Sequence, residues 1–213
     1  MNGLYPIVDV DSLKALKLDV LEFARQVLAC RPESLQLRAK HLSARETLDL
    51  LHPMRALCTA GGTALFANDR PDLALLAGCD GVHVGQDDLS VADVRKVAPG
   101  LRVGVSTHDL AQLRAGLEQR PDYVAFGPIF PTRSKQRPDP VVGLEGLVRA
   151  HELARSVGVP IVAIGGITQS NAERIAAMGI CGAVIGAILP ADGDVDGVAR
   201  IASRLQAALK GAA

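Results

Sequence analysis

The chain has 213 residues, of which 48% are hydrophobic, and its 23 basic residues balance 23 acidic ones. A formal net charge of zero argues against bulk electrostatic attraction to nucleic acid or to an acidic membrane, although it leaves room for a local cationic pocket. The chain has no Trp, only two Tyr and four Phe, which argues against a stacking platform for single-stranded nucleic acid. We therefore expect neither nucleic acid nor a membrane as a partner.

The four cysteines are far apart in the sequence and form no C-x-x-C pair. This spacing argues against a structural metal site or a disulfide framework. The sequence also contains no N-terminal signal pattern and no apolar run long enough to span a membrane. These features predict a protein of the reducing cytoplasm.

Short apolar runs alternate with helix-length amphipathic segments about eight times along the chain. The predicted strands are 4–8, 34–38, 64–67, 81–84, 102–106, 123–127, 161–164 and 183–185. The predicted helices are 19–29, 43–60, 70–77, 90–98, 109–118, 145–157, 169–178 and 195–209. Ser43 with Glu46 fits a capping box, and Ser90 and Ser170 are further candidate caps. Eight such units in 213 residues predict a single (β/α)8 TIM barrel that forms one domain, with an open doubly wound sheet as the alternative.

The most informative stretch is Gln36-Leu37-Arg38-Ala39-Lys40. On a strand, Gln36, Arg38 and Lys40 would share one face, because alternate side chains point the same way. In a parallel barrel both faces of a strand are buried, so the two cations need a compensating anion. The prediction is that a ligand supplies this anion; the alternative is an ordinary antiparallel strand whose polar side faces water. The prediction also depends on the strand register, since a slip of one residue would reverse the faces.

Other polar residues follow the predicted strands, where barrel enzymes carry their chemistry. Asn68-Asp69 follows one strand and Asp88 lies just beyond the next, so Asp69 and Asp88 are candidates to hold one Mg²⁺, with helix capping as the alternative role. Ser106 ends a strand. His83 lies within a strand, where a packed or hydrogen-bonded core histidine is expected.

Two glycine-containing turns resemble a phosphate grip. Gly165-Gly166 follows the seventh predicted strand, and Ile185-Gly186 ends the eighth. Glycines let the backbone approach an anion, which N–H groups of the turn can then bind. The alternative is a pair of tight strand-to-helix turns. The long irregular segment 128–143 carries Thr132, Arg133, Ser134 and Lys135. We interpret it as a cover for a phosphorylated substrate, with a solvated charged loop as the alternative.

Taken together, these motifs resemble the thiamine phosphate synthase family, in the family's order and across nearly the whole chain. The matching stretches are Gln36-Leu37-Arg38-Ala39-Lys40, Asn68-Asp69, Gly81-Val82-His83-Val84-Gly85-Gln86-Asp87-Asp88, Gly104-Val105-Ser106, Gly127-Pro128-Ile129-Phe130-Pro131-Thr132-Arg133-Ser134-Lys135 and Ala163-Ile164-Gly165-Gly166-Ile167. The resemblance implies a (β/α)8 barrel that joins hydroxymethylpyrimidine diphosphate to hydroxyethylthiazole phosphate, with Mg²⁺ as cofactor. Thiamine monophosphate and pyrophosphate are the implied products.

The resemblance also implies residue roles. Asp69 and Asp88 match the Mg²⁺ ligands, and Arg38, Lys40, Ser106 and Lys135 match residues expected to be catalytic. The pyrimidine diphosphate contacts are matched by Gln36, Arg38, Lys40, Asn68, Ser106 and Lys135. The thiazole phosphate contacts are matched by Thr132, Ser134, Gly165, Gly166, Ile185 and Gly186, with one or both of the paired glycines in contact.

Three positions depart from the family pattern. Ala39 stands where an acidic residue is usual, Ser134 replaces a threonine and keeps the hydroxyl, and Gly186 replaces a serine and leaves only backbone N–H groups. Two other functions stay open: a thiazole tautomerase that would use His108 for proton transfer, and a non-catalytic barrel that binds a thiamine precursor. The sequence does not decide whether the chain forms a homo-oligomer.

Overall fold

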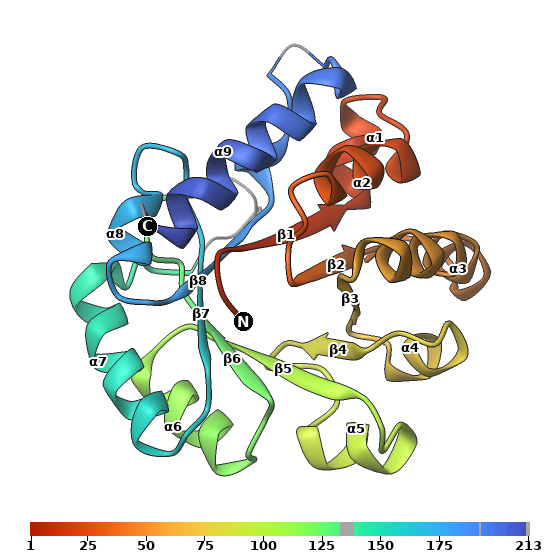
Figure 1. The fold of residues 1–213 in the computed structure, drawn as a ribbon. Helices are drawn as coiled ribbons and strands as arrows, with labels where there is room; N and C mark the ends of the chain where they lie inside the picture. The colour runs from red at the N-terminus through yellow and green to blue at the C-terminus, as the bar shows by residue number, and fades with distance from the viewer. Residues whose placement is uncertain (133–138, 192, 212–213) are drawn as a thin grey trace.

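The computed structural model describes residues 1–132, 139–191 and 193–211. Its eight strands pair in parallel and close into a barrel in the order β1 to β8, with helices around the outside (Figure 1). The strands are β1 (Leu4–Asp9), β2 (Ser34–Arg38), β3 (Ala64–Asn68), β4 (Gly81–Val84), β5 (Arg102–Thr107), β6 (Tyr123–Phe126), β7 (Ile161–Ile164) and β8 (Cys181–Val184). The predicted (β/α)8 barrel is therefore confirmed, and the open doubly wound sheet is excluded.

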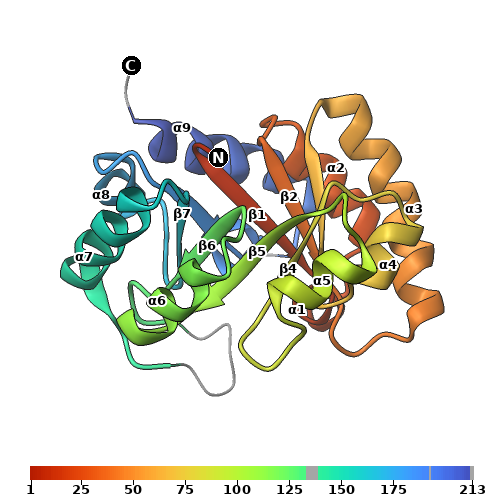
Figure 2. The same ribbon diagram turned by 90° about the horizontal axis from the view of Figure 1, so that it is seen from below.

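The helices follow their strands in turn. They are α1 (Val10–Ala15), α2 (Val20–Leu28), α3 (Ala44–Gly61), α4 (Pro71–Leu76), α5 (Val91–Val97), α6 (Leu110–Glu118), α7 (Gly143–Ser156), α8 (Ala172–Ala176) and α9 (Val198–Lys210), with 3-10 turns η1 (Gly186–Ile188) and η2 (Val195–Gly197). Figure 2 shows α1 at the lower end of the barrel, where the strands end, and the N-terminus at the opposite end. No helix in the described ranges is long and apolar enough to cross a membrane.

Several predicted bounds were wrong. The short helix α1 was missed, because Asp9 caps it directly at the end of β1 and leaves no linker to mark its start. The strand predicted at 183–185 begins instead at Cys181 and ends at Val184, since Ile185 has φ −114° and ψ −73° and leaves the extended conformation. Ser43 and Ser90 do cap their helices, but Ser170 does not, and α8 is limited to Ala172–Ala176.

The strand register separates an interior layer from an outer layer. Residues Ile7, Gln36 and Phe66 lie side by side on β1, β2 and β3. Ile7 and Phe66 belong to the cluster that fills the barrel, whereas Leu35 and Leu37 belong to the larger cluster between strands and helices. Gln36 therefore points into the barrel, and Arg38, two residues further along the same strand, shares its face. The register that the sequence argument required is the one observed.

Two glycines make room for aromatic rings inside the barrel. A Cβ atom on Gly81 would lie 2.2 Å from the Phe66 ring, and one on Gly104 would lie 2.1 Å from the Tyr123 ring. Tyr5, Phe66 and Tyr123 meet edge to face, with ring centroids 5.7 to 5.9 Å apart. Edge-to-face contacts of this kind stabilise an aromatic core beyond simple burial. The ring cluster lies directly beneath the polar residues at the barrel mouth.

Candidate active site

Arg38 at the end of β2 is held by a carboxylate that the sequence analysis did not identify. Its Nη1 donates to Oδ1 of Asp9 over 2.5 Å, and Asp9 is only 5% exposed. The other oxygen of Asp9 accepts from the backbone N–H and the hydroxyl of Ser12 at 3.2 and 2.5 Å. An acidic residue directly after an apolar strand, with serine three residues later, was the available signal for this capping position.

Lys40 lies beyond the end of β2 and is paired in a similar way. Its Nζ is 3.1 Å from Oδ2 of Asp69, and its side chain is exposed at the rim. Arg38 and Lys40 therefore both have protein carboxylates as counter-charges. The charge argument for an anionic ligand no longer holds by itself, because Asp9 and Asp69 supply the compensation that the sequence analysis assigned to a ligand.

Asp69 and Asp88 face each other across the ends of β3 and β4. Burial raises the pKa of Asp69, and a hydrogen bond to the Asp88 carboxyl raises it further, while Lys40 opposes both effects. Asp69 adopts φ +63°, a conformation that few non-glycine residues take. Asp88 accepts from the backbone N–H of Gly85 at 2.7 Å. Two ionised carboxyl groups this close repel each other, and a shared proton or a cation between them would relieve that repulsion.

This pair suits a hard divalent cation. Mg²⁺ takes oxygen ligands and is commonly held by one or two carboxylates, with waters and substrate phosphates completing its shell. Within the described residues, no group of three or more His, Cys, Asp or Glu side chains forms a closed metal cage. The donor set of Asp69 and Asp88 therefore fits Mg²⁺ better than a structural zinc ion. Asn68 lies beside Asp69 and Lys40 in a small cavity of about 140 Å³.

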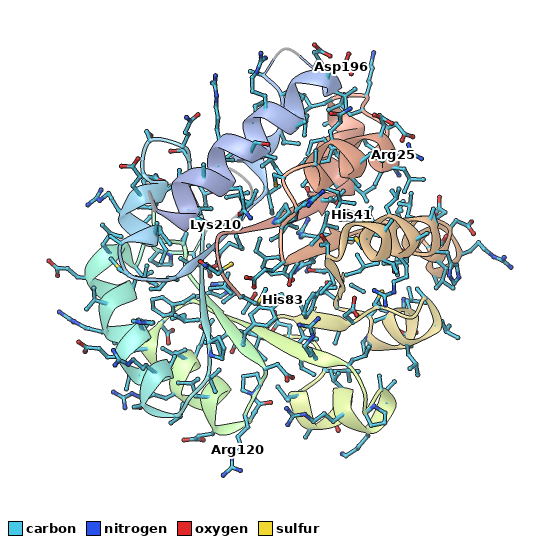
Figure 3. All side chains as sticks on the ribbon, viewed as in Figure 1. Arg25, His41, His83, Arg120, Asp196 and Lys210 are labelled. Carbon is cyan, nitrogen blue, oxygen red and sulfur yellow. The ribbon has the colours of Figure 1, made fainter. Side chains whose placement is uncertain are left out.

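Ser106 and Gln36 lie at opposite ends of a line of buried polar groups. Gln36 donates to the Tyr5 hydroxyl, and the Ser106 hydroxyl contacts Nε2 of His83 at 2.8 Å. Burial lowers the pKa of His83 to about 4, so its ring is neutral at physiological pH. His83 is thus the hydrogen-bonded core histidine expected from its place in the sequence, and Figure 3 shows it in the middle of the ring of strands.

A larger cavity of about 530 Å³ opens beside Ser106, between the ends of β5 to β8. Its wall includes six of the residues assigned above to substrates and one histidine. They are Ser106, Thr132, Gly165, Gly166, Ile185 and Gly186, together with His108. His108 places Nδ1 at 2.8 Å from the Gly127 carbonyl oxygen and at 3.6 Å from Asp139. Ser12, on the helix that the sequence analysis missed, also lines this cavity.

The paired glycines are required by the backbone. Gly165 and Gly166 have φ of +95° and +66°, and a Cβ atom on Gly166 would lie 2.5 Å from the Pro131 carbonyl oxygen. The N–H of Thr168 is already bound by the Asn171 side chain at 2.8 Å. Among the hydrogen bonds of the described residues, none uses the N–H groups of Gly166 or Ile167. These two groups are therefore the donors available to a phosphate at this turn.

The remaining predicted contacts, Ser134 and Lys135, lie outside the described residues, as does Arg133. The other positions fall into two neighbouring groups at one end of the barrel. Gln36, Arg38, Lys40, Asn68, Asp69, Asp88 and Ser106 come from β2 to β5 or the loops that follow, and Thr132, Gly165, Gly166, Ile185 and Gly186 follow β6 to β8. The site thus has one charged half and one half formed mainly by backbone groups.

Over most of its length the chain is similar to proteins named for thiamine phosphate synthesis. The family model described as thiamine monophosphate synthase matches residues 4–188. A thiamine-phosphate synthase of Anaeromyxobacter dehalogenans is 41% identical over 99% of this chain and 89% of its own, and one from Koribacter versatilis is 43% identical over 81% of each. The solved thiamine phosphate pyrophosphorylase of Pyrococcus furiosus superposes with a TM-score of 0.84 at 31% identity, covering 98% of this chain and 95% of its own.

Proposed function

The chain belongs to the thiamine monophosphate synthase family, and we propose that it joins hydroxymethylpyrimidine diphosphate to hydroxyethylthiazole phosphate with Mg²⁺ held by Asp69 and Asp88. The products would be thiamine monophosphate and pyrophosphate. The observation that carries the Mg²⁺ assignment is the contact between the two carboxyl groups beside Lys40. Burial is the main cause of the raised pKa of Asp69, and a cation between Asp69 and Asp88 would offset the further contribution of the Asp88 carboxyl.

The proposed reaction breaks the bond between the pyrimidine methylene carbon and the diphosphate oxygen. Both electrons of that bond leave with pyrophosphate, and the thiazole nitrogen then donates its lone pair to the cationic carbon. The residues that assist are those that stabilise the charge of the departing group, Arg38, Lys40 and Ser106. Bound Mg²⁺ would add positive charge at the same group. No protein nucleophile takes part, and proximity of the two substrates supplies the rest.

The second half of the site supports binding of a phosphorylated thiazole. The N–H groups of Gly166 and Ile167 and the Thr132 side chain would hold its phosphate. Gly186 offers only its backbone where a serine is usual in the family, so the phosphate is held by fewer side-chain donors. Ser134 and Lys135 would complete the two halves from the loop after β6. The four cysteines are all free thiols, which suits the cytoplasmic location that we also propose.

The test is a coupled product assay. Purified protein with both substrates and Mg²⁺ should form thiamine monophosphate and an equal amount of pyrophosphate.

The competing tautomerase activity has one observation in its favour, since His108 lines the larger cavity. Supplying the thiazole phosphate alone in deuterated water separates the two activities, because a tautomerase would exchange its ring proton without the pyrimidine. Binding of both substrates without any product would instead support a non-catalytic barrel.

A further inference from the structure

A continuous line of hydrogen bonds crosses the barrel interior from Gln36 to Ser106. Gln36 Nε2 lies 3.2 Å from Tyr5 Oη, and Tyr5 Oη lies 3.0 Å from Tyr123 Oη. Tyr123 Oη lies 2.8 Å from Nδ1 of His83, whose Nε2 lies 2.8 Å from Ser106 Oγ. Four of the five side chains are buried and Ser106 is partly exposed at the barrel mouth. We call this set of five residues the interior relay.

The donor at Gln36 and the buried proton of Tyr5 together favour one direction of the line. An amide nitrogen can only donate, so Tyr5 accepts from Gln36. If Tyr5 also accepted from Tyr123, its own buried proton would have no acceptor among the hydrogen bonds of the described residues, so we take Tyr5 to donate to Tyr123. Tyr123 then donates to Nδ1 of His83, because that is its remaining hydrogen-bond contact. A neutral histidine that accepts at Nδ1 carries its proton at Nε2, so it donates to Ser106. The Ser106 hydroxyl proton is then left over.

We propose that the interior relay orients Ser106 as a hydrogen-bond donor toward the barrel mouth, with Tyr5, Tyr123 and His83 as positioning residues. The ligand side of this inference rests on the proposed function, because a donor at this point suits a diphosphate oxygen. The opposite direction would make Ser106 donate to His83 and present only lone pairs to an anion. A buried hydrogen-bond donor or acceptor without a partner lowers the stability of the fold. The hydrogen bonds of the interior relay therefore all keep the same direction of donation, from Gln36 toward Ser106.

The first test uses the protein without any substrate. Nitrogen-15 spectra of the histidine rings should show His83 as the neutral form protonated at Nε2, and Tyr123→Phe should abolish this preference because Nδ1 loses its donor. A wild-type His83 protonated at Nδ1 would overturn the proposal. This result does not depend on catalysis, so it separates a failure of the relay from a failure of the proposed function.

The second test is a double-mutant cycle on turnover. Ser106→Ala should lower kcat by about 100-fold and Tyr123→Phe by about tenfold, and the double variant should be no slower than Ser106→Ala alone. Tyr5→Phe should have a smaller effect, because Tyr123 keeps the proton that it donates to His83. Multiplicative losses in the double variant would instead mean that Tyr123 acts on general packing and would refute the relay.

Stability measurements accompany the cycle. All four variants should unfold cooperatively, and the kcat of Tyr123→Phe should fall while KM for the thiazole phosphate stays within about twofold. If Tyr123→Phe does not fold, the histidine spectra of the wild type still decide the direction of the line. A wild-type spectrum with the Nε2 proton, together with no additional loss in the double variant, supports the proposal.

Discussion

Arg38 on β2 and Asp9 on β1 form a hydrogen-bonded ion pair at the mouth of the barrel, with 2.5 Å between Nη1 and Oδ1. The pair joins two neighbouring strands whose register places Asp9 beside Arg38. Asp9 also caps α1, so one carboxylate orients both the arginine and the helix that follows β1. The Arg38 side chain is 22% exposed, so part of it is accessible from the barrel mouth.

This pair makes Asp9 important for stability. Asp9→Ala should lower the free energy of unfolding by about 2–3 kcal/mol, because it removes a helix cap and leaves the Arg38 charge without its partner. Asp19→Ala is the matched control, since Asp19 caps α2 through the N–H groups of Leu21 and Glu22. Asp19→Ala should lower the free energy of unfolding by about 1 kcal/mol. Equal losses in urea titrations would show that the pair with Arg38 adds no stability.

Asp69 should control the response to Mg²⁺. Asp69→Asn keeps the shape of the side chain but removes one negative charge from the proposed ion site. Calorimetric titration of pyrophosphate in the presence of Mg²⁺ should therefore show at least about tenfold weaker binding in this variant. Asp87→Asn is the control, because Asp87 lies on the surface next to Asp88 and has no proposed ligand role. Unchanged binding in Asp69→Asn would refute the metal assignment.

Gly166 should tolerate no side chain. Gly166→Ala places a Cβ atom 2.5 to 2.7 Å from Pro131 and Phe130, in a conformation that L-residues rarely adopt. Gly158→Ala is the matched control, because Gly158 has φ +73° with no atom within 4 Å of the added Cβ. The control should cost about 1 kcal/mol, the left-handed penalty alone. Gly166→Ala should lower the free energy of unfolding by more than the control does, and it should also weaken binding of the thiazole phosphate. Equal losses of stability in the two variants would show that the contacts of Gly166 with Pro131 and Phe130 do not limit the side chain at this position.

Burial of His83 predicts a pH dependence of stability. Its pKa falls from the ordinary 6.5 to about 4, so between these values the unfolded chain binds a proton that the native chain does not. The stability that depends on neutral His83 is complete above pH 6.5 and is lost as the pH falls toward 4. The loss is on the order of 3 kcal/mol at most.

The histidine contribution can be isolated with two variants measured in the absence of Mg²⁺. Free energies of unfolding at several pH values should fall less steeply below pH 6.5 in His83→Gln than in the wild type. His41→Gln serves as the control, since the His41 side chain is 79% exposed, and its slope should match the wild type. Identical slopes for all three proteins would mean that His83 does not titrate in the native state as expected.

Local sequence was enough to predict the barrel and much of the rim. Apolar runs with a strand period, separated by amphipathic segments, indicate strands and helices without knowledge of their neighbours. Alternation along 34–38 placed Gln36 and Arg38 on one face, as the register confirms. The turn at Gly165 and Gly166 could also be predicted, because a positive φ and a close approach of the backbone both require glycine.

Pairing between distant segments was decided only by the tertiary structure. Asp9 and Arg38 are 29 residues apart, and Tyr5 and Tyr123 are 118 apart, so no local period connects them. Their contacts arise because closure of the barrel brings β1 beside β2 and places β1 and β6 side chains in one interior. Closure of the barrel also brings Lys40 into contact with Asp69 and Ser106 into contact with His83. Sequence identified the groups that carry charge, and the fold determined which of them satisfy one another and which remain available for a ligand.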